Sequence, residues 1–176
     1  MMDPWLIAGI TLAGGVAMWI VSRKRPLTPE VSVRSLLTQL GGNYVVLSGS
    51  ILQSEKGMIR IENSVVSPYG VFILNECREV GQVDVQPGKR EWQISGMGKN
   101  HLIYNPLWQT KKVIQELENR VGDFPFIPLV VFTRARLTGA RDYNVVEGGN
   151  MIAAIKSYTD PILTEDHQKK IMGILG

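Results

Sequence analysis

The sequence predicts an α/β or α+β fold in which helices flank a central mixed sheet, and two features of the chain point to it. Apolar residues recur at helical spacing in several separate segments. Stretches rich in β-branched and aromatic residues lie between them and are separated by Gly, Pro and Ser. The order helix, three strands, helix, strand, helix is typical of a sheet covered by helices. With 176 residues, 44% of them hydrophobic, the chain is long enough to bury one such core.

The first element is an uncharged apolar run at residues 5–22, WLIAGITLAGGVAMWIVS. As a helix it would rise about 27 Å, which nearly matches the hydrocarbon core of a bilayer. Trp5 and Trp19 lie near its ends, where indole rings favour the interface, and the positive residues 23–25 follow. Asp3 before the run argues against a cleaved signal peptide. We therefore expect a single-pass transmembrane helix in a bacterial inner membrane, with the C-terminal domain in the cytoplasm.

This interpretation divides the chain into an N-terminal tail (1–4), a transmembrane helix (5–22), a linker (23–28) and a cytoplasmic domain (29–176). The helix would contact membrane lipid. Gly9, Ala13 and Ala17 would place small side chains on one of its faces, where another membrane helix could approach closely. Membrane-protein partners or a homo-oligomer are expected on that ground, although membrane helices are rich in Gly and Ala in any case.

The cytoplasmic part begins with a helix, because Thr28 and Pro29 suit an N-cap and a first helical position. The sequence GGN at 41–43 ends it. SPYG at 67–70 predicts the tight turn of a hairpin between the second and third of three successive strands. These strands are expected at residues 44–52, 58–66 and 70–75.

Small strands are expected within residues 81–104, around Trp92. Asn105 as N-cap and Pro106 at the first helical position open a helix that runs to about Val121. The remaining elements are expected at 126–137 (one buried strand), 151–158 (a short helix) and 164–175 (a terminal helix capped by Thr164).

Composition excludes several kinds of site. A net charge of +3 permits a polyanionic partner without arguing for one. Cys77 is the only cysteine, so an intrachain disulfide and a cysteine-based zinc site are excluded. His101 and His167 have no second metal ligand at a recognisable spacing. The sequence SGMGKN at 95–100 lacks the glycine and the hydroxyl residue of a phosphate-binding loop.

Four pieces of the chain together resemble the nuclease-related domain (NERD) family, a branch of the PD-(D/E)XK nuclease fold. In order they are PEVSVRSLLTQL, IRIENSVVSPYGVFIL, Trp92 and NPLWQ. The resemblance covers about residues 29–133, and VVSPYGVFIL and NPLWQ are its most specific parts. It implies a restriction-endonuclease-like sheet and a relation to enzymes that cleave nucleic acids.

The chemistry of this chain departs from the family pattern. In that family a glutamate opens the first helix, an aspartate precedes the hairpin, and the next strand ends in Glu-x-Lys. An alignment without gaps places four residues on these catalytic positions: Glu30, Glu62, Asn75 and Cys77. A carboxylate and an ammonium are thus replaced by an amide and a thiol.

These replacements matter because hydrolysis in this fold would need carboxylates to hold a hard divalent cation and a lysine to orient the attacking water. Glu62 keeps the charge of a metal ligand, whereas Asn75 offers an uncharged oxygen. A buried thiol at Cys77 is neutral. Losing one preorganised electrostatic contact costs about 10²–10³ in rate. We therefore expect no cofactor, or Mg²⁺ at Glu62 if activity survives.

Glu76 and Arg78 provide an alternative, because Glu76-Cys77-Arg78 is itself a Glu-x-basic triplet. A one-residue deletion before Gly81 would place them on the two family positions. Side chains alternate along a strand, so this pair is expected on the face opposite Asn75 and Cys77 unless a bulge intervenes.

The candidate substrate-binding residues are Gln109, Asn105, Lys111, Arg134 and Arg136. Gln109 could approach a substrate in an active family member, although Asn105 and Gln109 also fit a plain helix start. The three basic residues could form a nucleic-acid surface, although solvated charge is the commoner explanation for such residues.

The favoured hypothesis is a membrane-anchored domain that has lost hydrolysis and serves as a nucleic-acid-binding or assembly module of a membrane complex, for example in DNA transfer or secretion. One alternative is an active divalent-metal-dependent nuclease that uses Glu30, Glu62, Glu76 and Arg78. The other is a purely structural subunit of a membrane complex.

Overall fold

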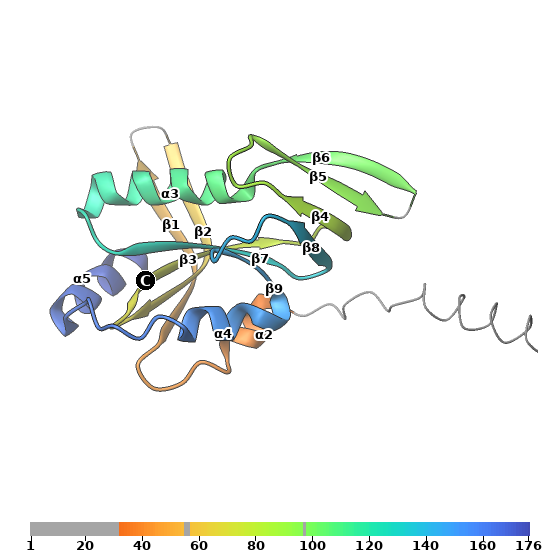
Figure 1. Ribbon diagram of the computed structural model, residues 1–176. Helices are drawn as coiled ribbons and strands as arrows, with labels where there is room; N and C mark the ends of the chain where they lie inside the picture. Colours follow the sequence, from red (N-terminus) through yellow and green to blue (C-terminus); the bar gives the residue numbers. More distant parts are fainter. Residues whose placement is uncertain (1–31, 55–56, 97) are drawn as a thin grey trace, which may run out of the picture.

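The computed structural model describes residues 32–54, 57–96 and 98–176. Within them a five-stranded sheet has the order β1-β2-β3-β7-β9, and a four-stranded sheet has the order β6-β5-β4-β8 (Figure 1). The strands are β1 (Val45–Ser54), β2 (Gly57–Ser67), β3 (Gly70–Cys77), β4 (Gly81–Val85), β5 (Glu91–Gly96), β6 (Lys99–Tyr104), β7 (Phe126–Phe132), β8 (Ala135–Gly139) and β9 (Val145–Glu147). The helices are α2 (Val33–Leu37), α3 (Pro106–Val121), α4 (Met151–Lys156) and α5 (Glu165–Leu175), with a short 3₁₀ helix η2 (Gly148–Asn150).

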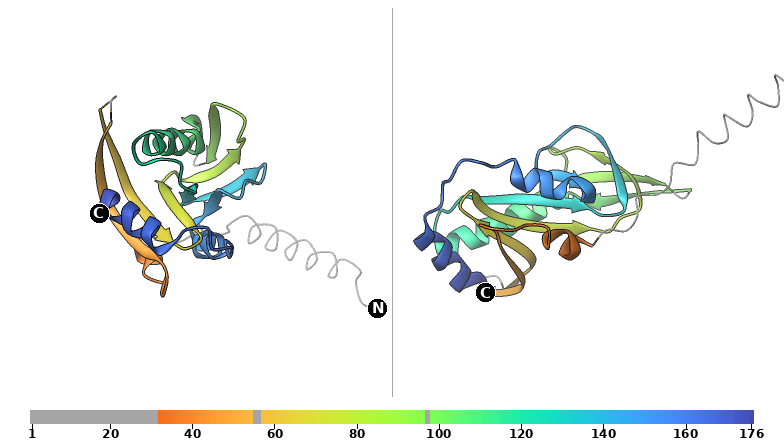
Figure 2. Two further views of the ribbon diagram at one scale, coloured as in Figure 1. Left: turned by 90° about the vertical axis from the view of Figure 1, so that its left-hand side faces the viewer. Right: turned by 90° about the horizontal axis from the view of Figure 1, so that it is seen from below.

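The five-stranded sheet is mixed, as the sequence predicts. Strands β1, β2 and β3 are antiparallel, whereas β7 runs parallel to both β3 and β9. Helix α3 lies over one face of this sheet, and α2 and α4 lie under the other (Figures 1 and 2). The expectation of a mixed α/β fold with flanking helices is therefore confirmed.

Two apolar clusters lie on the two faces of β3 and fix the direction of its side chains. Phe72 and Leu74 belong to a buried cluster with residues of α2 and α4. Val71 and Ile73 belong to a second cluster, with residues of α3 and α5. The alternation expected along this strand is confirmed, and it divides the polar residues at its end in the same way.

The central parallel strands pass together from one sheet into the other. β3 continues into β4 and β7 into β8, and the parallel pairing continues as well, from Cys77 opposite Phe132 to Gly81 opposite Ala135. Gly81 has a φ of 128°, and a Cβ added there would lie 2.4 Å from the carbonyl oxygen of Ser95. Only glycine fits where the chain enters the second sheet.

The single strand expected at 126–137 is wrong, because the chain changes sheets within it. The backbone N–H of Thr133 donates to the Cys77 carbonyl at 3.0 Å, after which Arg134 is exposed and β8 begins at Ala135. Ala135 and Leu137 keep a strand-like alternation with Arg134 and Arg136 after the break, so the pattern alone does not reveal it. The three-residue strand Val145–Glu147 was not predicted either, since it is too short to show a period.

The predicted hairpin and the starts of the helices capped by Asn105 and Thr164 are confirmed, whereas the helix start predicted at Thr28 and Pro29 lies outside the described residues. The Ser67 hydroxyl accepts the N–H of Tyr69 and donates to the carbonyl of Gly70, which closes the turn between β2 and β3. Thr164 caps α5 by accepting the N–H of His167. The small strands expected around Trp92 are present as β4, β5 and β6.

Several predictions fall outside the described residues. They are the tail at 1–4, the transmembrane helix at 5–22, the linker at 23–28 and the catalytic position Glu30. In the part of the chain that the structure describes, no helix is both long and apolar enough to cross a membrane.

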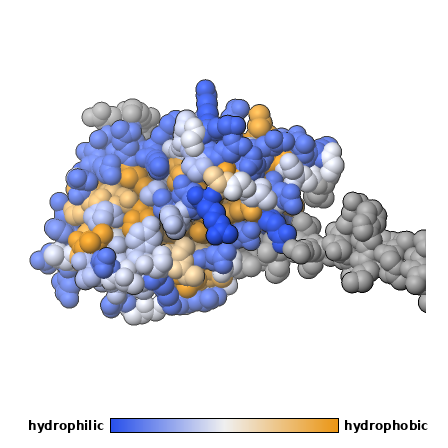
Figure 3. Space-filling model, viewed as in Figure 1, coloured by the Kyte–Doolittle hydropathy of each residue, from blue (hydrophilic) through white to orange (hydrophobic). Residues whose placement is uncertain are grey.

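The surface is mainly hydrophilic on the side seen in Figure 3, where hydrophobic side chains are scattered among polar ones. The apolar side chains of the sheet lie instead in the clusters between the layers. A charged and polar surface over a dry interior is what an ordinary globular domain presents.

Asn105 ties the start of α3 to the turn between β4 and β5. Its Oδ1 accepts the N–H groups of Leu107 and Trp108, and its Nδ2 donates to the carbonyls of Pro87 and Lys89. The side chain is 0% exposed. Each of its hydrogen-bonding atoms is therefore engaged in holding the second sheet against the helix.

We expect Asn105→Ala to lower the free energy of unfolding by about 2–4 kcal/mol, because it removes an N-cap and leaves buried carbonyls unpaired. Urea unfolding of the full chain measures this loss. Gln109→Ala, one turn later and exposed, is the matched control and should change stability by less than about 0.5 kcal/mol. Equal effects of the two changes would contradict the role of Asn105.

Candidate functional site

A cavity of about 260 Å³ lies between β2, β3 and the first turns of α3. Its walls include Glu62 from β2, Asn75 from β3, and Gln109 and Thr110 from α3. Three residues that the sequence analysis selected for different reasons therefore meet in one place. The fold brings them together because β2 and β3 form a hairpin and α3 packs across the face of β3.

Glu62 reaches this cavity through the register of the hairpin. Ser64 lies opposite Ile73, and these two residues share a face of the sheet. Glu62 is two residues before Ser64 and Asn75 is two residues after Ile73, so alternation places both on that same face. Glu62 is exposed, and Gln109 beside it is exposed as well.

The Asn75 side chain is used as a donor toward α3. Its Nδ2 donates to the carbonyl of Pro106 at 3.3 Å and to the hydroxyl of Thr110 at 3.2 Å. The Thr110 hydroxyl in turn donates to the Pro106 carbonyl at 2.9 Å. A carboxylate at this position would have no proton to give that carbonyl and would repel it. The amide therefore fits a strand-to-helix contact better than it fits a metal.

Thr110 is the member of the site that the sequence analysis missed. It is buried and completes the contact between β3 and α3. The available signal was its position four residues after Pro106, from which a threonine hydroxyl reaches back to a carbonyl of the preceding turn. That spacing alone does not reveal the contact with Asn75, because the two residues are 35 positions apart.

Cys77 lies at the border of a third apolar cluster, which includes Trp92, Phe132 and Leu107. Burial raises the pKa of the Cys77 thiol to about 12, and the neighbouring Glu79 and Glu76 add to the effect. The thiol is therefore protonated and neutral at physiological pH. It supplies neither a nucleophile nor the fixed positive charge that a lysine would bring.

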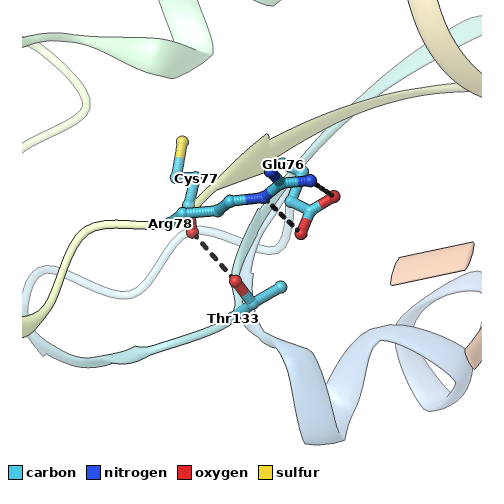
Figure 4. Close-up of polar contacts among 4 residues, drawn as sticks. All are labelled: Glu76, Cys77, Arg78 and Thr133. Carbon is cyan, nitrogen blue, oxygen red and sulfur yellow. Dashed lines mark hydrogen bonds and ion pairs between the residues drawn. The ribbon is translucent and has the colours of Figure 1, made fainter. Parts of the chain in front are cut away.

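Glu76 and Arg78 bind each other beside the end of β3. The Arg78 Nε lies 3.1 Å from the Glu76 Oε1, and the Glu76 side chain is only 9% exposed against 69% for Arg78. Figure 4 shows the Cys77 thiol pointing away from this pair. Glu76 pairs with Val131, which belongs to the apolar cluster on the α2 and α4 side.

The sheet therefore separates the carboxylate of Glu76 from the face that carries Asn75. Glu76 borders the cavity as the residue after Asn75, but its side chain alternates to the other side. The shifted triplet would need Glu76 and Glu62 on one face, and this arrangement does not provide it.

The remaining substrate-binding candidates are not brought to the cavity. Asn105 is buried and fully engaged in structure. Lys111 is exposed on α3, Arg134 follows β7, and Arg136 is exposed on β8. Of the predicted set, only Gln109 lines the cavity.

The described residues do not make a site for Mg²⁺. Two carboxylates border the cavity, Glu62 and Glu76, and the second alternates to the opposite face of the sheet. The Asn75 amide is turned toward the helix by its two donor bonds. Across residues 32–54, 57–96 and 98–176, no three His, Cys, Asp or Glu side chains lie close enough to hold a metal ion. A hard divalent cation requires several oxygen ligands, and this donor set falls short of them.

Comparison with known proteins gives one family. The model of the nuclease-related domain family (NERD) matches residues 28–133 of the chain. No curated protein and no solved structure gives a significant match.

We expect Asn75→Asp to lower the free energy of unfolding by about 2 kcal/mol at pH 7. The change removes two donor bonds and places a negative charge against the Pro106 carbonyl. Gln109→Glu adds the same charge at the exposed wall of the same cavity and should have an effect within about 0.5 kcal/mol. If both variants unfold at the same urea concentration as the wild type, the amide has no such role.

Cys77 also predicts a pH dependence of stability. The thiol of the unfolded chain ionises near 9.0 and that of the folded chain near about 12, so the unfolded state releases its proton first as pH rises. Stability should therefore fall between these values, by about 1 kcal/mol per pH unit.

Cys77→Ala isolates this contribution, because it removes the thiol and leaves every other side chain of the protein in place. The stability difference between wild type and Cys77→Ala, measured by urea unfolding under reducing conditions, should be constant below pH 8 and should shrink above pH 9. A constant difference up to pH 11 would show that the thiol is accessible to solvent.

Proposed function

Because the chain belongs to the nuclease-related domain family, we propose that it is a nucleic-acid-binding or assembly module of a membrane complex that no longer hydrolyses phosphodiesters. The Asn75 amide is the observation that carries this proposal. It stands where the family has a metal-binding glutamate, and it donates to the Pro106 carbonyl and to Thr110. A side chain committed in this way stabilises the fold where the reaction would require a metal ligand.

The state of Cys77 supports the loss of hydrolysis independently. A nuclease of this fold relies on a positive charge near the attacking water and the developing negative charge. The Cys77 thiol is neutral, and its pKa of about 12 keeps it so. Two of the contributions that accelerate phosphodiester cleavage are therefore missing from the same strand.

A domain can lose catalysis and still bind nucleic acid, because binding and catalysis depend on different side chains. Affinity for nucleic acid comes mainly from Lys and Arg side chains that neutralise phosphates, together with polar and aromatic contacts. Exposed residues of this kind remain on the domain, including Lys111, Arg134 and Arg136. A domain that lost its metal ligands can thus keep a nucleic-acid surface.

The membrane part of the proposal rests on the sequence of residues 5–22. The apolar run, its terminal tryptophans and the following positive residues favour a single-pass anchor in a bacterial inner membrane, with the domain in the cytoplasm. Lipid would surround the anchor, and Gly9, Ala13 and Ala17 offer a face to another membrane helix or to a second copy. DNA transfer and secretion are examples of complexes in which such a module would serve.

Two other functions are less well supported. An active nuclease using Glu76 and Arg78 needs these residues on the face of Glu62, whereas Glu76 alternates to the opposite face and binds Arg78. A purely structural subunit would need no nucleic-acid surface, and the family of the chain argues against that.

The proposal is tested with the full chain and labelled DNA and RNA, single-stranded and duplex. We expect no cleavage with Mg²⁺ or Mn²⁺ above the level seen with a chelator, because the metal ligand and the positive charge are absent. We expect binding that persists in the chelator and weakens as salt rises.

Glu62→Ala separates the alternatives. This variant should bind nucleic acid as the wild type does, and like the wild type it should show no cleavage. Metal-dependent cleavage that Glu62→Ala abolishes would show an active nuclease. Absence of binding at every salt concentration, with membrane proteins that co-purify, would favour the purely structural subunit.

A further inference from the structure

The second sheet has one face toward the core and one toward solvent. Trp92, Ile94 and Val83 fill the inner face beneath it. The side chains at the alternate positions point outward, and we call the surface they form the outer face. They are exposed or half-buried throughout: Gln82, Asp84, Glu91, Gln93, Leu102, Tyr104, Arg136 and Thr138.

Strand register aligns these side chains in rows across the sheet. Thr138, Asp84, Gln93 and Leu102 are successive cross-strand partners, and Glu91 lies opposite Tyr104. Cross-strand partners have their side chains within contact distance of one another. The outer face is therefore a continuous surface of hydroxyl, amide and apolar groups that also carries the carboxylates of Asp84 and Glu91.

A hollow of about 390 Å³ lies at one end of this face, beside the turn between β4 and β5. Its walls combine four kinds of side chain: the cations Lys89 and Arg90, the carboxylate Glu91, the amides Gln86 and Gln93, and the apolar Leu102. Leu102 is 61% exposed. The walls of the hollow therefore offer cations, a carboxylate and an apolar side chain.

Tyr104 carries two cations on its ring at the edge of the same face. The Lys112 Nζ donates to the Tyr104 hydroxyl at 3.1 Å and lies 5.2 Å from the ring centroid. The Arg90 guanidinium lies 5.8 Å from that centroid. Trp108 contacts the ring edge-on, and its indole N–H donates to the Pro87 carbonyl.

These two cations have no carboxylate at ion-pair distance within the part of the chain that the structure describes. Like charges held on one ring repel each other, and an anion between them would relieve that repulsion. A phosphate suits this position, because a guanidinium and an ammonium both donate to its oxygens.

The cations also connect the outer face to the cavity of Glu62 and Asn75. Gln109 lines that cavity, and Lys112 follows it on α3 at the i+3 spacing that makes neighbours on a helix surface. The second sheet lies beyond this end of α3 (Figure 1). A strand of phosphates leaving the cavity would therefore meet Lys112 next.

We propose that a single-stranded nucleic acid crosses the outer face, with its phosphates at Arg90 and Lys112 and a base against Leu102 in the neighbouring hollow. Tyr104 positions the two cations. This inference rests on the proposed nucleic-acid function and identifies the surface that performs it. Single strands fit because their bases are free to contact an apolar side chain, whereas duplex bases are stacked inside the helix.

The test measures binding of a labelled 20-nucleotide single strand to the full chain in lipid nanodiscs, by fluorescence anisotropy over a range of salt concentrations. Arg90→Gln and Lys112→Gln should each weaken binding about three- to tenfold at low salt. Each should also reduce the slope of log affinity against log salt by about 0.7, because one phosphate contact is lost. Lys156→Gln removes the same charge from an exposed position on α4 and is the matched control.

Leu102→Ser tests the apolar contact separately. It should weaken single-strand binding about threefold while leaving the salt slope unchanged, because it removes no charge. Ile162→Ser, at an isoleucine of similar exposure away from the sheet, should change neither quantity. An equal loss in both variants would overturn the assignment of Leu102 and with it the base contact.

The remaining outcomes distinguish this inference from the proposed function. If Lys156→Gln weakens nucleic-acid binding as strongly as Arg90→Gln and Lys112→Gln do, the inference about the outer face is wrong. The proposed nucleic-acid-binding function would still stand. Equal competition by polyglutamate would show a surface for acidic protein instead. Absence of any nucleic-acid binding would overturn both.

Discussion

The structure depends on the parallel alignment of β3 with β7 and on its continuation into β4 and β8. At the crossing, the Thr133 N–H donates to the Cys77 carbonyl, and on either side the same two strands stay paired. Because β3 and β7 leave the five-stranded sheet side by side, the strand direction of β4 and β8 in the second sheet is fixed. Gly81 permits this crossing by allowing the Ser95 backbone to approach closely. The positions of the cavity, of Cys77 and of the outer face all follow from this alignment.

The crossing also determines the contacts of the polar residues at the end of β3. Residues at the end of β3 lie between α3, the second sheet and the α2–α4 layer, so each makes packing or hydrogen-bonding contacts there. Asn75 binds α3, Cys77 joins the apolar cluster of Trp92, and Glu76 binds Arg78 on the opposite side. A half-buried amide with both its donor bonds made and a neutral thiol at an apolar border stabilise the domain, whereas an unpaired carboxylate or ammonium there would cost free energy without a metal or substrate. Selection for stability alone would favour the residues that this chain carries.

Catalysis and binding make different demands on such a domain. Hydrolysis requires a few groups placed within a fraction of an ångström, and removing one of them costs orders of magnitude in rate. Binding to a polyanion sums several contacts of modest strength over a wide surface, so it tolerates the loss of any one. The contacts that we propose for the cations at Tyr104 and for the hollow beside Leu102 are of the second kind. A membrane anchor would add to this by holding the domain at one place, where weak binding to a long nucleic acid is sufficient.

By itself, the sequence determined the features that depend on short-range physical chemistry. The alternation of apolar residues in β3, the hairpin at Ser67, and the caps at Asn105 and Thr164 all follow from residues within a few positions of one another, and the family resemblance is confirmed over residues 28–133. Tertiary structure decided where the chain changes sheets at Thr133, which helix receives the Asn75 amide, and which cations meet at Tyr104. These outcomes depend on partners far apart in the chain, such as Asn75 with Thr110 or Thr133 with Cys77. The apolar pattern of a segment specifies that it is buried. Only the packing of distant strands and helices specifies which residues it is buried against.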